Sequence, residues 1–154
     1  MPDELLATDD PLHIIRRVSD LAPDHTATVD ADLRAAELQA VACSSETSGT
    51  LELLAVCRAV GRRVAIVSDN CSDAIRAYLD RNGLSELVEH VQGRDPHRMT
   101  PNPYPIEQAL RILGVDRTDA VLIGDSEADL DAARAAGVRV IAYANKAPQA
   151  RHTR

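Results

Sequence analysis

Four short apolar runs, separated by helix-length amphipathic segments, constrain the fold of this chain most strongly. They cover residues 64–67, 120–123 and 139–142, with a weaker one at 87–91 that Glu89 and His90 interrupt, and apolar residues recur at helical spacing between each successive pair. A short continuous apolar run is typical of a strand buried on both faces, and an intervening helix makes neighbouring strands parallel. The sequence therefore predicts an α/β fold with a Rossmann-like parallel sheet of about four strands, right-handed crossovers and helices on both faces.

The chain before this alternation has a helical pattern throughout. Apolar residues at helical spacing over residues 10–60 predict a helical segment that precedes the sheet. Arg16 and Arg17 fall on the outer side of its first helix. We therefore expect the α/β core over residues 61–147 and a polar tail over residues 148–154.

Composition narrows the class of protein. The 154 residues are 45% hydrophobic with 2% aromatic residues, which predicts one globular domain with an aliphatic, alanine-rich core. A net charge of −7 argues against a nucleic-acid surface, and no apolar run approaches the ~20 residues of a membrane span. Cys43, Cys57 and Cys71 are widely spaced and are interpreted as reduced thiols. We expect a cytoplasmic protein.

An acidic loop directly after the third apolar run is the strongest indication of function. Asp125 and Asp129 follow the predicted strand 120–123 at the point where a helix begins. Ligands of open α/β sheets bind beyond the carboxyl ends of the strands, and carboxylate oxygens are preferred ligands of hard divalent cations. The spacing therefore predicts a metal site, with helix capping as the alternative role of both side chains.

Three stretches occur in order at predicted strand ends: Val-Ser-Asp-Asn at 67–70, Thr-Pro-Asn-Pro-Tyr-Pro at 100–105 and Gly-Asp-Ser-Glu-Ala-Asp at 124–129. Together they resemble the haloacid dehalogenase (HAD) superfamily, in its phosphoglycolate-phosphatase-like branch, over residues 10–147. The resemblance implies a Mg²⁺-dependent phosphoric monoester hydrolase that acts on a small phosphorylated metabolite through an aspartate nucleophile.

The resemblance also assigns segments and residues. It implies that residues 10–60 are a cap-like helical segment that ends in a return helix. It implies that Ser68, with Asn70 beside it, binds the phosphoryl group, and that Asp125 and Asp129 hold Mg²⁺. A cation and a lysine are needed in such a site because nucleophile and phosphate are both anions. The family's lysine position is occupied here by Thr100, which carries no charge.

The family's nucleophile motif, Asp-x-Asp on an apolar first strand, does not stand at the start of this sequence. One Asp-x-Asp occurs at Asp30 and Asp32, but its polar flank at residues 24–27 does not suit a buried central strand. Asp30 is therefore interpreted as a helix N-cap rather than a nucleophile. Arg94 and Arg98 lie near Thr100 in sequence but are not assumed to replace the lysine.

In the family, the first strand lies between the strands that end here at Ser68 and Asp125. Its absence leaves two open sheet edges. These two strands could pair directly or leave a loosened sheet, residues 24–30 could fill the gap, or a partner chain could supply a strand or dimerise through the edges. Direct pairing or a loosened sheet is favoured.

These observations give three functional hypotheses. The first is a HAD-like phosphatase relative that is catalytically impaired, because the nucleophile motif is absent and Thr100 replaces the lysine. The second is the carboxyl-terminal part of an active Mg²⁺-dependent phosphomonoesterase whose natural start lies upstream. The third is a non-catalytic interaction module, including a homodimer through exposed sheet edges.

Overall fold

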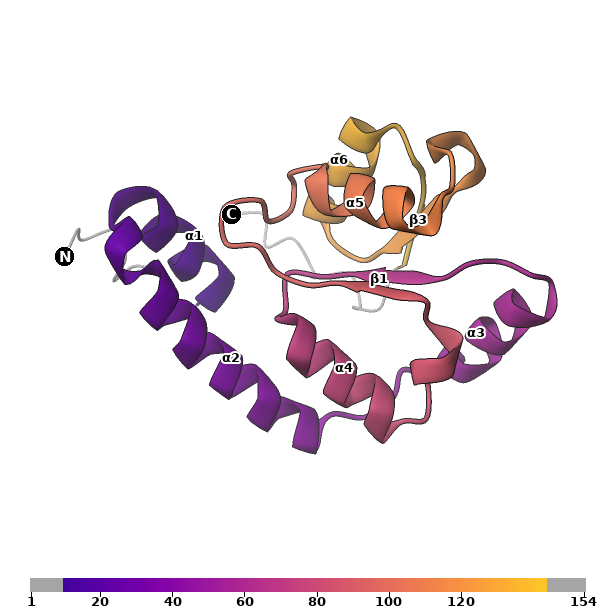
Figure 1. Cartoon of the computed structure of the whole chain (residues 1–154), viewed down its shortest axis with the longest axis horizontal. Coiled ribbons are helices and arrows are strands. Elements are labelled where there is room, and N and C mark those ends of the chain that lie inside the picture. The colour runs from indigo at the N-terminus through magenta and orange to yellow at the C-terminus, as the bar shows by residue number, and fades with distance from the viewer. Residues whose placement is uncertain (1–9, 144–154) are drawn as a thin grey trace, which may run out of the picture.

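The computed structural model describes residues 10–143, which form an α/β fold of six α-helices and four strands (Figure 1). In chain order these are α1 Pro11–Leu21, α2 Thr26–Cys43, α3 Thr50–Ala59, β1 Ala65–Val67, α4 Ser72–Arg81, β2 His90–Gln92, α5 Tyr104–Leu113, β3 Val121–Gly124, α6 Glu127–Ala136 and β4 Arg139–Ala142. The α/β class is confirmed, and α1, α2 and α3 lie in the part of the chain that precedes the strands. The predicted tail 148–154 and the last residues of the predicted core, 144–147, lie outside the described residues.

The four strands form two separate parallel pairs. β1 pairs with β2 in a register that places Ala65 opposite His90, and β3 pairs with β4 with Val121 opposite Arg139. Direct pairing of β1 with β3 is therefore wrong, and the sheet is loosened instead. Residues 24–30 do not fill the gap, because they belong to a 3-10 turn, Pro23–His25, and to the start of α2.

Each strand pair has its own hydrophobic core. The β1–β2 core is built on α4 and the turn after it, and the β3–β4 core is built on α5 and α6. Their buried residues are Ile75, Leu79, Leu84 and Val91 in the first, and Ile106, Ala132, Ala133, Ala136 and Val138 in the second. Val67 of β1 packs against the second core, so α5 and β1 join the two halves. The predicted aliphatic, alanine-rich core is confirmed.

Helices lie on both sides of β1, with α4 on one side and α5 and α6 on the other (Figure 1). α1 and α2 form an arm beside this layered core, and α2 contacts α4. The arm therefore reaches the same end of the molecule as the loops that follow β1 and β2. This placement brings helical residues close to the strand ends.

Two helix starts differ from the sequence prediction. α2 begins at Thr26 because the 3-10 turn before it leads directly into the helix, so Asp30 lies inside α2 and its interpretation as an N-cap is wrong. α4 is capped by Cys71, whose Sγ accepts a hydrogen bond from the N–H of Ala74 at 3.4 Å. Ser72 and Asp73, whose side chains are usually favoured as helix caps, are instead the first two residues of α4.

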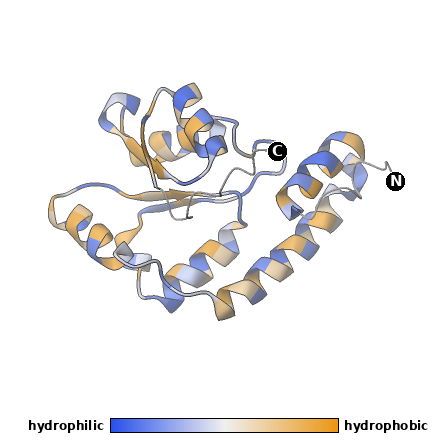
Figure 2. Cartoon of the chain, turned by 180° about the vertical axis from the view of Figure 1, so that it is seen from behind, coloured by the Kyte–Doolittle hydropathy of each residue, from blue (hydrophilic) through white to orange (hydrophobic). Residues whose placement is uncertain are grey.

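Apolar side chains remain exposed on the β3–β4 pair. Val121, Ile123 and Ile141 are 47%, 50% and 55% exposed, although their strands are strongly hydrophobic (Figure 2). Strands of parallel sheets are normally covered on both faces. This pair is therefore covered on one face by α5 and α6 and open on the other.

Among the described residues, no helix combines the length and hydrophobicity of a bilayer span.

Candidate active site

A cavity of about 520 Å³ lies between the two strand pairs and α1. The carboxyl ends of β1 and β3 both reach it, and α1 closes another side. Its lining residues are Asp10, Leu12, Arg16, Val67, Ser68, Asp69, Thr100, Ile106, Leu122, Ile123, Gly124, Asp125, Ser126, Ala128, Asp129 and Ala132. The structure therefore brings Ser68, Thr100, Asp125 and Asp129 to one cavity, whereas Asn70 is not among its lining residues.

The acidic loop is shaped by the start of α6. Ser126 accepts a hydrogen bond from the N–H of Asp129 at 3.1 Å, and Asp129 Oδ2 accepts one from the N–H of Ser126 at 3.1 Å. The N–H of Asp125 also donates to Asp129 Oδ2, at 3.3 Å. This capping box stabilises the helix start and fixes the Asp129 carboxylate beside the end of β3.

Glycine is required at the end of β3 by the close approach of this carboxylate. A Cβ at Gly124 would lie 2.6 Å from Cβ of Asp129 and 3.0 Å from its Oδ2. Two non-bonded carbon atoms overlap sterically at 2.6 Å, so any side chain at position 124 would displace Asp129. The loop therefore combines a capping function with a defined carboxylate position.

Two carboxylates at this position fit Mg²⁺. Mg²⁺ is usually bound by one or two carboxylates, with waters and substrate phosphate oxygens completing the octahedron. Asp125 and Asp129 provide such a pair, and Asp129 Oδ1 accepts no hydrogen bond within the capping box. Residues 10–143 contain no cluster of three or more acidic, His or Cys side chains suited to a metal, so water and phosphate oxygens would have to supply the other ligands.

Ser68 is oriented by the turn after β1. Its N–H donates to the carbonyl oxygen of Gln92 at 3.0 Å, which extends the β1–β2 pairing by one residue. Its Oγ accepts a hydrogen bond from the N–H of Asn70 at 3.1 Å. Because Oγ acts as the acceptor in that bond, its own hydroxyl hydrogen can be donated to an anion in the cavity.

Thr100 forms a neutral contact where a lysine would bring charge. Its Oγ1 donates to Asp69 Oδ2 at 2.6 Å and its N–H donates to Asp69 Oδ1 at 3.2 Å. Both oxygens of Asp69 are therefore satisfied, but its negative charge is not neutralised. Sequence reasoning missed a role for Asp69, because this contact joins positions 31 residues apart.

Arg16 enters the cavity from the helical segment. Its Nη2 donates to the carbonyl oxygen of Thr100 at 2.8 Å, and Leu12, one turn earlier on α1, lines the same cavity. The outward placement predicted for Arg16 is therefore wrong. The helical spacing contained the signal, because residues four apart share a helix face and Leu12, as an apolar residue, is expected on the inner face.

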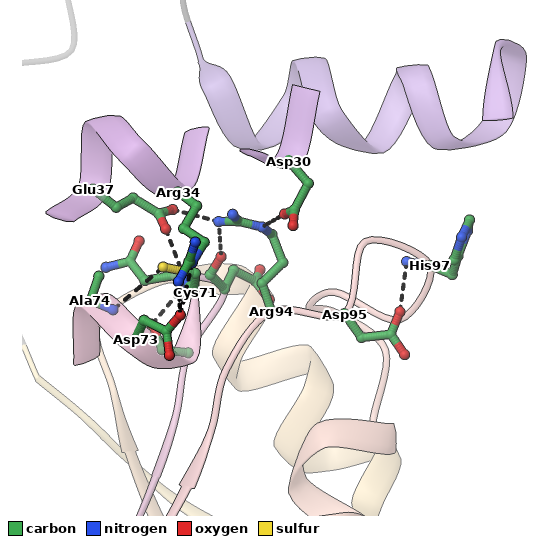
Figure 3. A network of polar contacts seen from close by, with 12 residues as sticks. Asp30, Arg34, Glu37, Cys71, Asp73, Ala74, Arg94, Asp95 and His97 are labelled. Atoms are coloured by element: carbon green, nitrogen blue, oxygen red, sulfur yellow. Dashed lines mark hydrogen bonds and ion pairs between the residues drawn. The ribbon is translucent and has the colours of Figure 1, made fainter. Parts of the chain in front are cut away.

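Arg94 and Arg98 have other partners. The buried guanidinium of Arg94 binds Asp30 Oδ1 through Nε at 2.8 Å and binds Glu37 through Nη1 (Figure 3). Nη1 also donates to the carbonyl oxygen of Asp69 at 3.0 Å. Arg98 lies over the ring of Tyr104, 4.0 Å from its centroid. Neither arginine lines the cavity.

Burial alone lowers the pKa of Arg94, but hydrogen bonds to Glu37 and Asp30 outweigh burial and raise that pKa above its ordinary value. Glu37 also accepts a hydrogen bond from the N–H of Cys71 at 2.8 Å. The network therefore joins α2 to the loops after β1 and β2. Asp30, the alternative nucleophile, is held in this network and does not line the cavity.

The chain is similar in sequence to several known proteins. A family model for haloacid dehalogenase-like hydrolases matches residues 17–143. A phosphoglycolate phosphatase of Rhodospirillum rubrum is 34% identical over 102 residues, which is 66% of this chain and 42% of that protein. A plasmid-encoded phosphoglycolate phosphatase of Cupriavidus necator is 40% identical over 88 residues, which is 56% of this chain and 38% of that protein.

A solved structure extends the likeness to most of the described fold. The structure of CbbY from Rhodobacter sphaeroides in complex with phosphate has a TM-score of 0.73 at 25% identity, and the match covers 90% of this chain and 67% of that one. The chain spans about two fifths of the length of the two curated relatives it matches. The family model covers far more than half of the chain, so this protein belongs to the haloacid dehalogenase-like hydrolases.

Proposed function

We propose that this chain carries the Mg²⁺-binding and phosphate-binding half of a phosphomonoesterase site. The observation that supports the proposal is the convergence of Ser68, Asp125 and Asp129 on one cavity. Asp125 and Asp129 hold Mg²⁺, which when bound offsets the negative charge of the phosphate. Ser68 donates a hydrogen bond to a phosphate oxygen. The ligand is a small phosphorylated metabolite, and the protein acts in the cytoplasm.

The site is catalytically impaired as it stands, because no described carboxylate in the cavity is placed as a nucleophile. Asp10 caps α1 by accepting a hydrogen bond from the N–H of Leu12 at 2.9 Å. Both oxygens of Asp69 accept hydrogen bonds from Thr100. Asp125 and Asp129 are assigned to the metal. A carboxylate attacks phosphorus only if one of its oxygens is unengaged and in line with the leaving group.

A longer active enzyme is the second candidate, and the open strand edges favour it. Within residues 10–143, β1 and β3 are each paired on one side alone, and both line the cavity between them. A further parallel strand placed there would complete both pairings and could carry an aspartate at its carboxyl end. The cheapest test is to read the DNA upstream of the codon for Met1 for an in-frame Asp-x-Asp strand.

An interaction module is the third candidate. The exposed apolar side chains of Val121, Ile123 and Ile141 favour association through the β3–β4 pair. Size-exclusion chromatography with light scattering tests it: a dimer that becomes monomeric on Ile123→Glu supports association through this face. A concentration-independent monomer contradicts it.

Thermal unfolding with Mg²⁺ and inorganic phosphate tests the binding site. Ligands that bind the native state raise Tm by mass action, so Mg²⁺ and phosphate together should raise it in a dose-dependent manner. Asp125→Ala should abolish the Mg²⁺ effect. The control Asp131→Ala removes an exposed carboxylate on the same helix, paired there with Arg134 at 3.2 Å, and should preserve the effect. Absence of a shift in the unmodified chain contradicts the proposal.

Turnover of p-nitrophenyl phosphate tests the impairment separately. The pure chain should hydrolyse this substrate at no more than the background rate. Mg²⁺-dependent turnover that disappears in Asp125→Ala would show that the site is active without a further strand.

Thr100→Lys should strengthen phosphate binding, because it adds a positive charge beside Asp69.

A further inference from the structure

We infer that Arg16, on the helical segment, is the cation that binds the phosphate in this cavity, and that it provides the charge missing at Thr100. The inference rests on the proposed function and extends it to a residue that the motifs do not include. It also means that the site is shared between the core and α1. Ser68 and the acidic loop come from the core, whereas the positive charge comes from the arm.

Position is the first argument. Ile15, the neighbour of Arg16, is fully buried, and α1 packs against α2 and the 3-10 turn between them. Arg16 and Leu12 lie one helical turn apart, and both face the cavity. The hydrogen bond from Arg16 Nη2 to the carbonyl oxygen of Thr100 then fixes the guanidinium beside the position that lacks the lysine. The arginine therefore reaches, from another element, the place that Thr100 leaves uncharged.

Charge is the second argument. Arg16 is the cationic side chain among the described residues that line the cavity, together with four aspartates, Asp10, Asp69, Asp125 and Asp129. Within residues 10–143 its guanidinium makes one hydrogen bond, to a neutral carbonyl, and no ion pair. Four of its five N–H groups thus remain to bind an anion.

The chemistry of the guanidinium identifies the kind of ligand. Its planar fork binds two oxygens of a phosphate at once, and such charge-assisted bonds are roughly twice as strong as neutral ones. A phosphate dianion would otherwise meet a cavity dominated by carboxylates. Arg16 and Mg²⁺ together make the cavity able to hold it, and the phosphate then bridges α1 to the strand ends.

Isothermal titration calorimetry with inorganic phosphate at saturating Mg²⁺ tests the inference, with Mg²⁺ titrated alone as the second measurement. Arg16→Gln should raise the Kd for phosphate by on the order of 10–100-fold, the loss of a charge-assisted pair, and leave the Kd for Mg²⁺ unchanged. Arg17→Gln is the matched control: the adjacent residue of the same helix does not line the cavity, so both affinities should remain unchanged.

The outcomes separate this inference from the proposed function. If the unmodified chain binds phosphate and Arg16→Gln binds it equally well, the inference fails and the proposed function stands. If the unmodified chain binds no phosphate, both fail. Should Arg16→Gln not fold, as judged by circular dichroism, Arg16→Lys decides. That variant keeps the charge but loses the fork, so the Kd for phosphate should rise several-fold, and an unchanged Kd overturns the inference.

Discussion

The two strand pairs of this protein are similar in architecture but are stabilised in different ways. The β1–β2 half is tied to the helical arm by the buried network of Arg94, Glu37 and Asp30. The β3–β4 half has no such link among the described residues, and it leaves Val121 and Ile123 about half exposed. One half is therefore fixed by long-range polar contacts, whereas the other is held by its own helices and carries the metal-binding loop.

This difference bears on how the cavity is held together. Its anion-binding residues, Ser68 and Arg16, lie on the β1 side and on α1, and the metal-binding residues Asp125 and Asp129 lie on the β3 side. Because β1 and β3 do not pair, α5 and the ligands themselves are what can couple the two sides. Substitutions in each half should therefore have separable effects.

The largest effect should come from removing Arg94. Arg94→Ala leaves Glu37 and Asp30 without their cation, and breaking a buried ion pair costs about 3 kcal/mol or more of unfolding free energy. Asp30 is partly exposed, which places the effect at the lower end of the usual range. Urea unfolding at pH 7 measures it.

The control for Arg94 is Arg98→Ala, which removes an exposed arginine of the same loop and should cost less than about 1 kcal/mol. A further variant, Arg94→Met with Glu37→Leu, should recover part of the loss, because well-packed apolar residues can replace a buried pair. Equal stability of Arg94→Ala and the unmodified chain would mean that the arm is not held by this network.

An intermediate effect is expected at Gly124. The added Cβ in Gly124→Ala displaces Asp129, which breaks the capping box and moves a metal-binding carboxylate. The expected cost is about 2 kcal/mol, from overpacking and loss of the cap, together with loss of the Mg²⁺-dependent rise in Tm. Differential scanning calorimetry with and without Mg²⁺ measures both.

Asp129→Asn separates the two roles at this loop. An amide oxygen can still accept the capping hydrogen bonds, so stability should change little while the Mg²⁺ response is lost. If Asp129→Asn responds to Mg²⁺ as the unmodified chain does, Asp129 is a capping residue and not a metal ligand.

A smaller, pH-dependent effect belongs to the β1–β2 half. Burial, with a further contribution from the nearby Glu37, raises the pKa of the Cys71 thiol above its ordinary value of 9.0. As the pH rises, the thiol therefore ionises in the unfolded chain before it ionises in the folded one, and this ionisation favours unfolding. The contribution of Cys71 to the free energy of unfolding is complete below about pH 9 and is lost as the pH rises further. The Tm of the unmodified chain should fall more steeply between about pH 8.5 and 10 than that of Cys71→Ser.

Serine is the suitable replacement because it also caps helices well, so Cys71→Ser keeps the start of α4 and removes the titration. The exposed Cys43 provides the control, and Cys43→Ser should leave the pH profile of Tm as it is. Parallel profiles for the unmodified chain and Cys71→Ser would show that the thiol does not contribute.

The smallest effect should come from the open face of the β3–β4 pair. Ile123→Thr replaces a half-exposed residue with another β-branched one, and the unfolding free energy should change by no more than about 0.5 kcal/mol. Leu122→Thr, which alters a side chain packed against α5 and α6, should cost more than about 1 kcal/mol. A large loss for Ile123→Thr would show that this face is covered in solution.

The secondary-structure elements and the acidic loop could be predicted from the order of the residues. Strand and helix identity follow from periodicity within a few residues, and the capping box of Ser126 and Asp129 is a contact between positions three apart. The gathering of Ser68 and Asp125 at strand ends also followed, because parallel strands present their carboxyl ends at one edge. These features depend on contacts between residues close in sequence or on the direction of the strands, and both can be derived from the order of the residues.

How the two halves of the molecule meet could not be predicted and became visible in the three-dimensional arrangement. Arg94 finds Asp30 across 64 residues, and Arg16 reaches Thr100 across 84. No periodic pattern encodes such pairs, because they depend on how α1 and α2 dock against the strand ends. The separation of β1 from β3 is likewise a long-range feature. The two strands lie in separate pairs and are joined through the packing of Val67 of β1 against the core around α5, which neither strand's own residues encode.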